Sequence, residues 1–214
     1  MISLDSAPKG ARYMTTYSGQ QLYPLAPDPE QINIEDIVHG LANQACFHGQ
    51  TSDFYSLAQH SLLVASLVPL PLKLTALLHD AAAAYFGEME PSVRQLLPEF
   101  CIIEKRLMAA IGERFAVSGF EAPALKRAHL VAQATECRDV LPQQSVRKSA
   151  QGRLAPIPRR IEFMSPDEAK EQFMELFGEL VRQDNPWKPP PAVCRQDGRL
   201  SMSVVYGHAR GGAI

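Results

Sequence analysis

Apolar residues recur along the chain at the spacing of an α-helix. In several segments they fall at intervals of three and four residues, which places them on one helical face. The segments that follow this pattern are residues 33–45, 56–68, 71–87, 102–115, 124–141 and 166–181. The sequence PSVRQLLPEF adds a short helix that Pro98 should end. We therefore expect an all-α fold.

Capping signals mark the start of two of these helices. Asn33 precedes two acidic residues, Glu35 and Asp36, as an N-cap residue does before the first helical turn. Ser165 and Glu168 have the spacing of a capping box, with proline at the first helical position. Both helices should begin at these residues.

The segments between and beyond the helices carry other signals. β-forming residues flank the turn-compatible pair Ser18-Gly19 within residues 12–25, which predicts a small hairpin before the helices. The polar, proline-containing stretch at 143–160 is expected to be a loop.

Length and composition indicate one domain. The chain has 214 residues, of which 46% are hydrophobic, enough to bury one sizeable core. After Asn185 the composition changes to a Pro/Gly-rich tail. We therefore expect an N-terminal segment at 1–11, one helical domain at 12–183 that includes the hairpin, and a tail at 184–214.

Charge and cysteine content exclude several classes of protein. The net charge is −2 and the basic residues are dispersed, so no stripe for duplex nucleic acid is present. No apolar run approaches the roughly 20 residues of a membrane span, and the first residues lack the apolar core of a secretory signal. The four cysteines contain no Cys-x-x-Cys pair. We expect a reduced, cytoplasmic protein that does not bind membranes.

The stretch TALLHDAAAAYFGE, residues 75–88, places His79 and Asp80 in an otherwise apolar run. His60 lies nineteen residues earlier, on the preceding predicted helix. Imidazole and carboxylate together suit divalent ions, and a bound cation would remove the cost of burying Asp80. The alternative is a chance dipeptide in which the aspartate caps a helix or pairs with a basic side chain.

Whole segments resemble a known family. The chain is similar to the HD-domain metal-dependent phosphohydrolases, and most of all to prophage-type and bacterial members near the 5′-deoxynucleotidases. The likeness covers roughly residues 14–181. The segments that carry it are YSGQQLYPL (17–25), DFYSLAQHS (53–61), ALLHDAAAAYFGE (76–88), LLPEF (96–100) and ATECRD (134–139).

The resemblance implies a helical bundle that holds one divalent metal ion, either Zn, Mn, Co, Ni or Fe. The family gathers its ligands in the order His, His-Asp, Asp. Here His60 matches the first ligand, and His79 with Asp80 matches the central pair. His129 stands where the last aspartate is expected, which favours Zn, Ni or Cu over Mn or Mg because a carboxylate is lost. The alternative for His129 is a partly buried helical histidine.

Three positions depart from the family pattern. Ala83 replaces a glutamate that moves protons, Cys46 replaces an arginine expected against phosphate, and Gln50 replaces a histidine. Loss of a general acid or base costs about 10²- to 10⁴-fold in rate. Glu88 retains the acidic residue that follows the conserved glycine of the family pattern.

The resemblance and the residues together give a set of expected roles. Glu88 and Asp80 are the expected catalytic residues, and Tyr55 and Gln50 the expected contacts to substrate. Tyr55 has the alternative of a core residue, since aromatic side chains at a loop-to-helix junction are often buried. Glu136 is a further candidate base, but we favour for it an ordinary ion pair with a basic residue such as Arg138.

We expect the protein to hydrolyse nucleotide phosphates with a metal-activated water. The alternative is a catalytically degenerate HD-domain protein that binds metal or nucleotide without efficient turnover. A purely structural domain, with neither metal nor ligand, is a third hypothesis. The expected partner is a nucleotide-type small molecule, and the resemblance also allows a homodimer.

Overall fold

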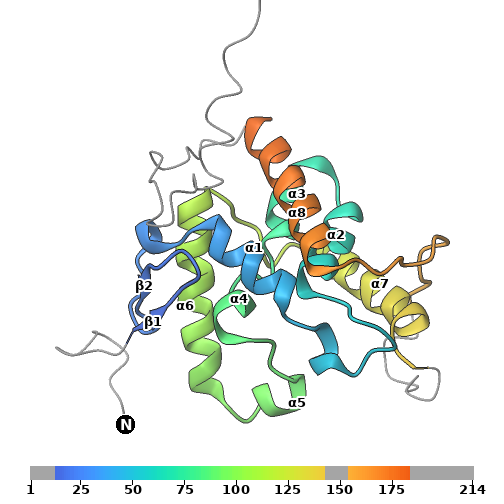
Figure 1. Cartoon of the computed structure of the whole chain (residues 1–214), viewed down its shortest axis with the longest axis horizontal. Helices are drawn as coiled ribbons and strands as arrows, with labels where there is room; N and C mark the ends of the chain where they lie inside the picture. Colours follow the sequence, from blue (N-terminus) through green and yellow to red (C-terminus); the bar gives the residue numbers. More distant parts are fainter. Residues whose placement is uncertain (1–12, 143–153, 184–214) are drawn as a thin grey trace, which may run out of the picture.

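The computed structural model describes residues 13–142 and 154–183. Within these ranges helices dominate, and a small two-stranded sheet lies near the beginning of the chain (Figure 1). This confirms the predicted all-α fold with an N-terminal β-hairpin. The predictions for residues 1–11 and 184–214, and for most of the loop at 143–160, lie outside the described residues.

Most helices follow one another with short connections, whereas a longer segment separates the last two. Of three 3₁₀ turns, η1 (Pro29–Gln31) precedes the first α-helix, and η2 (Cys46–Gly49) and η3 (Leu70–Leu72) lie between helices. The α-helices of the described ranges are α1 (Ile34–Asn43), α2 (Leu57–Ser66), α3 (Lys73–Leu77), α4 (Ala83–Phe86), α5 (Pro91–Arg94), α6 (Pro98–Phe115), α7 (Pro123–Asp139) and α8 (Pro166–Arg182).

The hairpin is hydrogen-bonded to the first helix. β1 (Met14–Thr15) pairs antiparallel with β2 (Gln21–Leu22). In the turn between them, the Ser18 backbone N–H and hydroxyl donate to the two oxygens of Asp36 on α1, at 2.5 and 2.8 Å. The hairpin therefore packs against the helical part instead of extending from it.

The predicted capping residues start their helices as expected. The Asn33 side chain accepts from the Glu35 N–H at the start of α1. Ser165 and Glu168 form a complete capping box at the start of α8. On α2 the Ser56 hydroxyl accepts from the Gln59 N–H. Each contact satisfies an N–H that the first turn would otherwise leave unpaired.

The single helix predicted over residues 71–87 is wrong. The chain forms α3, leaves helical geometry at residues 78–82, and resumes as the short α4. His79 Nδ1 lies 2.7 Å from the Ala76 carbonyl oxygen, which the N–H of Asp80 would engage in a continuous helix. The Gln44 side chain also donates to the Ala83 carbonyl at 2.9 Å. The His79 side chain thus occupies a carbonyl that the backbone of a continuous helix would use, and the His-Asp pair lies in a turn.

Helix α2 lies at the centre of the fold. It packs against α1, α3, α7 and α8, so its side chains face most of the core. On its other side α8 also packs against α1 and α3, and Phe177 of α8 meets Phe115 of α6 edge-on with ring centroids 5.6 Å apart. Because α2 is enclosed, a polar side chain on it must find a partner inside the protein.

Among residues 13–142 and 154–183, no helix combines the length and the apolar character that crossing a bilayer requires.

Candidate metal centre

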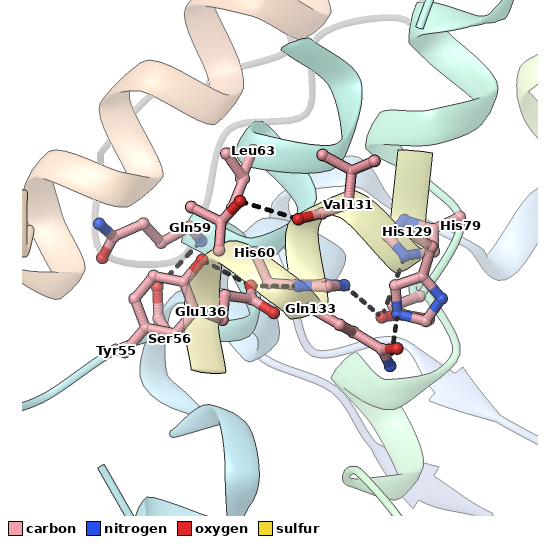
Figure 2. Close-up of polar contacts among 12 residues, drawn as sticks. Tyr55, Ser56, Gln59, His60, Leu63, His79, His129, Val131, Gln133 and Glu136 are labelled. Atoms are coloured by element: carbon pink, nitrogen blue, oxygen red, sulfur yellow. Dashed lines mark hydrogen bonds and ion pairs between the residues drawn. The ribbon is translucent and has the colours of Figure 1, made fainter. Parts of the chain in front are cut away.

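Three histidines from separate parts of the chain meet at one point. His60 comes from α2, His79 from the turn after α3, and His129 from α7. Their ring centroids lie 5.1 to 5.3 Å apart, so the rings form a nearly equilateral triangle (Figure 2). One ring nitrogen of each lies within 4.8 Å of those of the other two. The three histidines are therefore close enough to bind a metal ion.

Two of these imidazoles have a nitrogen available for a ligand. His79 Nδ1 donates to the Ala76 carbonyl, and His60 Nδ1 lies 2.6 Å from a carboxylate oxygen of Glu136. Each contact holds the proton on Nδ1 and leaves the Nε2 lone pair of the neutral ring exposed to the centre. Both Nε2 atoms are buried and lack a hydrogen-bond partner. Buried polar atoms are rarely left in this state, and a metal ion would satisfy both.

Asp80 lies at the edge of the cluster. Its Oδ2 atom is 3.3 Å from His79 Nε2 and 3.6 Å from His60 Nε2. Its side chain is 36% exposed, whereas that of His60 is 3% exposed. Asp80 is therefore the member of the set that both faces the centre and reaches solvent.

The ionisable side chains around the centre shift one another's pKa values. Burial alone would raise the pKa of Asp80, but the imidazoles of His79, His60 and His129 lower it. Burial opposes a charge on His60, yet the adjacent carboxylate of Glu136 raises the pKa of this histidine to about 9. Burial and the two neighbouring histidines lower the pKa of His129 to about 4. In the metal-free protein His60 therefore favours its protonated form and His129 its neutral form, with the carboxylates of Asp80 and Glu136 beside them.

Glu136 has a different partner from the one expected. The ion pair with Arg138 is wrong, because that arginine pairs with Asp139 at 2.7 Å. The Glu136 carboxylate is fully buried and accepts hydrogen bonds from His60 and from the Tyr55 hydroxyl, the latter at 2.7 Å (Figure 2). The residue therefore belongs to the shell around the candidate metal centre.

A cavity of about 240 Å³ opens beside the histidines. We call it the α6–α7 cavity, and His79, Asp80, Ala83 and His129 line its inner end. Three basic residues, Arg94, Lys105 and Lys126, lie on its wall together with two glutamates. Asp80, Glu104 and Glu121 match these three positive charges, so the lining is balanced in charge before any cation binds.

The ion pairs of this wall hold two of the basic side chains in place. Arg94 makes a two-point ion pair with Glu104 of α6. Lys126 of α7 lies 2.6 Å from Glu121. The positive charge of Arg94 also helps to lower the pKa of Asp80, so it acts on the carboxylate at the edge of the centre.

The expected substrate contacts and the expected acid lie away from this cavity. Tyr55 is 0% exposed and has no surface with which to touch a ligand, so its role is the structural one. Gln50 lies on the surface after η2, and Glu88 is exposed beyond α4. Desolvation of the Glu88 carboxylate, with a smaller contribution from Asp80 and opposed by His48, raises the pKa of this residue. Cys46 is buried in the core.

Sequence reasoning missed the positions of two residues. Arg94 lies on the short helix α5, and nothing in its local sequence indicates that it reaches the cavity beside Asp80. Glu136 does carry a signal, because it follows His129 by seven residues and so lies on the same face of α7. That spacing predicts a place near the histidines, though not a contact with His60.

The comparisons with known proteins identify relatives. No protein-family model matches the chain. An uncharacterized protein of Rhodobacter capsulatus is 38% identical over 131 residues, which are 56% of this chain and 67% of that protein. The uncharacterized protein YfdR of Escherichia coli K12 is 33% identical over 169 residues, which are 78% of this chain and 95% of YfdR. At that identity and coverage, the chain belongs to the same protein family as YfdR.

Proposed function

We propose that the protein is an HD-type metal-dependent phosphohydrolase that acts on nucleotide phosphates. The observation that carries the proposal is the pair of buried Nε2 atoms on His60 and His79, which make no hydrogen bond and lie beside the Asp80 carboxylate and His129. Imidazole nitrogens that lack any hydrogen-bond partner in a polar, enclosed site fit a divalent cation. His60, His79 and His129, with Asp80, would hold it.

A divalent cation bound there would supply Lewis acidity and an activated water for hydrolysis of a phosphate ester. The chain itself would position the substrate. The α6–α7 cavity adjoins Asp80 and His129, and the guanidinium of Arg94 on its wall can form two hydrogen bonds with a phosphate group. Glu104 fixes Arg94 in place, so little side-chain freedom is lost when the phosphate binds.

Proton transfer is the weak part of this site. Ala83 lines the cavity where the resemblance places a glutamate, and alanine cannot accept or donate a proton. Asp80 is the carboxylate on the cavity wall nearest the histidines, and its lowered pKa keeps it ionised at neutral pH. Asp80 can therefore accept a proton, and we expect hydrolysis to be slow.

Ala83 also favours a second candidate function. The protein would then bind metal and nucleotide in the same cavity without turnover. Both candidates require the cation, so metal binding does not separate them, whereas release of product does.

The test is phosphate release from a panel of nucleoside mono- and triphosphates, with zinc- or manganese-loaded protein. The matched control is His79→Ala, which removes one ligand. The proposal expects the wild-type chain to release phosphate above the level of the variant. Binding of both metal and nucleotide without any release would establish the second candidate, and failure of the wild-type chain to bind any divalent metal would overturn both.

A further inference from the structure

The carboxylate of Glu136 is buried on the inner face of α7 and is 0% exposed. Within residues 13–142 and 154–183, its hydrogen-bond partners include no arginine or lysine. An isolated buried carboxylate is costly unless it is hydrogen-bonded or compensated by charge. Its two contacts are with His60 on α2 and with Tyr55, which precedes α2, as Figure 2 shows.

We propose that Glu136, held by Tyr55, is a positioning residue that prepares His60 as a metal ligand. This inference rests on the proposed function, because it assumes that the three histidines bind a cation. The short contact from His60 Nδ1 to the carboxylate, 2.6 Å, fixes the ring orientation and keeps the proton on Nδ1. The Nε2 atom then faces the centre, and in the neutral ring its lone pair is the one that binds a cation.

The carboxylate also strengthens the ligand. A histidine that donates to a carboxylate is a better electron donor to a metal than one that donates to a neutral carbonyl. His79 has such a neutral partner, the Ala76 carbonyl, and His129 has the Gln133 side chain 3.5 Å away. His60 is therefore the imidazole whose basicity this chain increases.

The charge of the site gives this arrangement a second role. Asp80 lies directly beside two of the rings, with its Oδ2 atom 3.6 Å from His60 Nε2 and 3.3 Å from His79 Nε2. Glu136 adds a second negative charge one imidazole away, so that the pair balances a divalent ion. Glu136 would in this way offset part of the charge that the aspartate expected at position 129 would have carried.

The geometry argues against a role for Glu136 in proton transfer to substrate. The carboxylate has no exposed surface and does not line the α6–α7 cavity, and His60 stands between it and the centre. Tyr55 and His60 also contact the same oxygen, Oε1. A group in this position can act on a metal only through the histidine.

The experiment compares metal affinities of the purified chain, measured by competition with a chromophoric chelator for Zn²⁺ and by the visible absorption of bound Co²⁺. Glu136→Gln keeps the shape and removes the charge, and we expect affinity to fall about 10- to 100-fold. Tyr55→Phe removes one hydrogen bond to the carboxylate, and we expect a loss of roughly 3- to 10-fold. The Co²⁺ spectrum should change in Glu136→Gln, which a purely structural role would not cause.

The matched control is Asp139→Asn, one turn further along the same helix. Asp139 is also a buried carboxylate, but its partners are Arg138 and Arg160, away from the histidines. We expect wild-type metal affinity in this variant. If Glu136→Gln binds as tightly as Asp139→Asn, the inference is overturned while the proposed function stands. If the wild-type chain binds no metal, the proposed function fails first.

A folding defect in Glu136→Gln would be detected by thermal unfolding of the metal-free proteins. Tyr55→Phe then decides, because it retains the ring and the packing. Weaker metal binding in a fully folded Tyr55→Phe supports the inference, and wild-type affinity overturns it.

Discussion

His129 is the residue that should set the metal preference of this site. It brings a third neutral nitrogen where the resemblance places a carboxylate, and nitrogen ligands favour Zn²⁺ over Mn²⁺. We predict that His129→Asp shifts the ratio of Zn²⁺ to Mn²⁺ affinity toward Mn²⁺ by on the order of tenfold. Competition binding with both metals measures this. An unchanged ratio would show that His129 is not a ligand.

Ala83 should limit turnover. It lines the α6–α7 cavity beside His79 and Asp80, within reach of a substrate held there. We predict that Ala83→Glu raises phosphate release about 100-fold or more, because a carboxyl group can then move a proton. Ala83→Gln is the control, since it has the same shape and no titratable proton. Equal rates in the two variants would place the defect elsewhere.

The sequence predicted the positions of some site residues and not of others. The spacing and the resemblance predicted that His60, His79 and His129 would meet, and the structure brings their rings together. The contact of Glu136 with His60 joins positions 76 residues apart, and the preference of helical acids for a nearby arginine gave the wrong partner. Local sequence carries no information on which buried partner a carboxylate finds across two helices.

At the scale of elements, α1 packs closely against α4, the short helix that follows the turn with His79. A Cβ atom on Gly40 of α1 would lie 2.6 Å from the Ala84 carbonyl oxygen and 2.8 Å from the Ala84 Cβ. Both helices would have to separate to admit it. Only glycine allows this approach.

We predict that Gly40→Ala destabilises the protein by about 1 to 3 kcal/mol through overpacking. In an unconstrained helix the same change stabilises by roughly 0.5 to 1 kcal/mol, so the two cases differ in sign. Urea unfolding of the metal-free chain measures the difference. A more stable variant would mean that α1 and α4 are not packed as closely as described.

A second element contact joins the end of α7 to the segment before α8. Asp139 accepts from the Arg138 side chain, from Arg160 and from the Ile161 N–H. These contacts, led by the hydrogen bonds from Arg138, lower the pKa of Asp139 in the folded state. The Asp139 carboxylate therefore stabilises the folded state at a pH above its unfolded-state pKa, which is about 4. This stabilisation is lost as the pH falls below about 4 toward the folded-state pKa.

We predict that Asp139→Asn costs on the order of 1 kcal/mol at pH 7, since solvent around the arginines screens part of the attraction. The difference between wild type and variant should shrink as the pH is lowered from about 5 to 3. Denaturant unfolding at several pH values gives the comparison. A difference that stays constant over this range would contradict the predicted ionisation.

The helices themselves were largely predictable, with one instructive exception. Helix starts at Asn33 and Ser165 followed from capping chemistry, which is local. The break at residues 78–82 did not, because alanine-rich sequence favours helix. In the structure the His79 side chain takes the Ala76 carbonyl, in place of the backbone hydrogen bond that the local preference predicts.

At the scale of the whole molecule, three segments far apart in the sequence contribute nitrogen atoms to one centre. The ring centroids of His60, His79 and His129 lie within 5.3 Å of one another, and α2 places the first of them in the core. The Nε2 atoms of His60 and His79 are buried without a hydrogen bond, which costs free energy unless a cation is bound. The central claim is therefore that a divalent ion binds there.

The most direct test is the metal content of the purified chain, loaded with Zn²⁺, desalted and measured by elemental analysis beside His79→Ala. We predict one zinc ion per wild-type chain and a large loss of bound zinc in the variant. A wild-type chain without stoichiometric metal, or a variant that retains as much zinc as the wild type, would contradict the account.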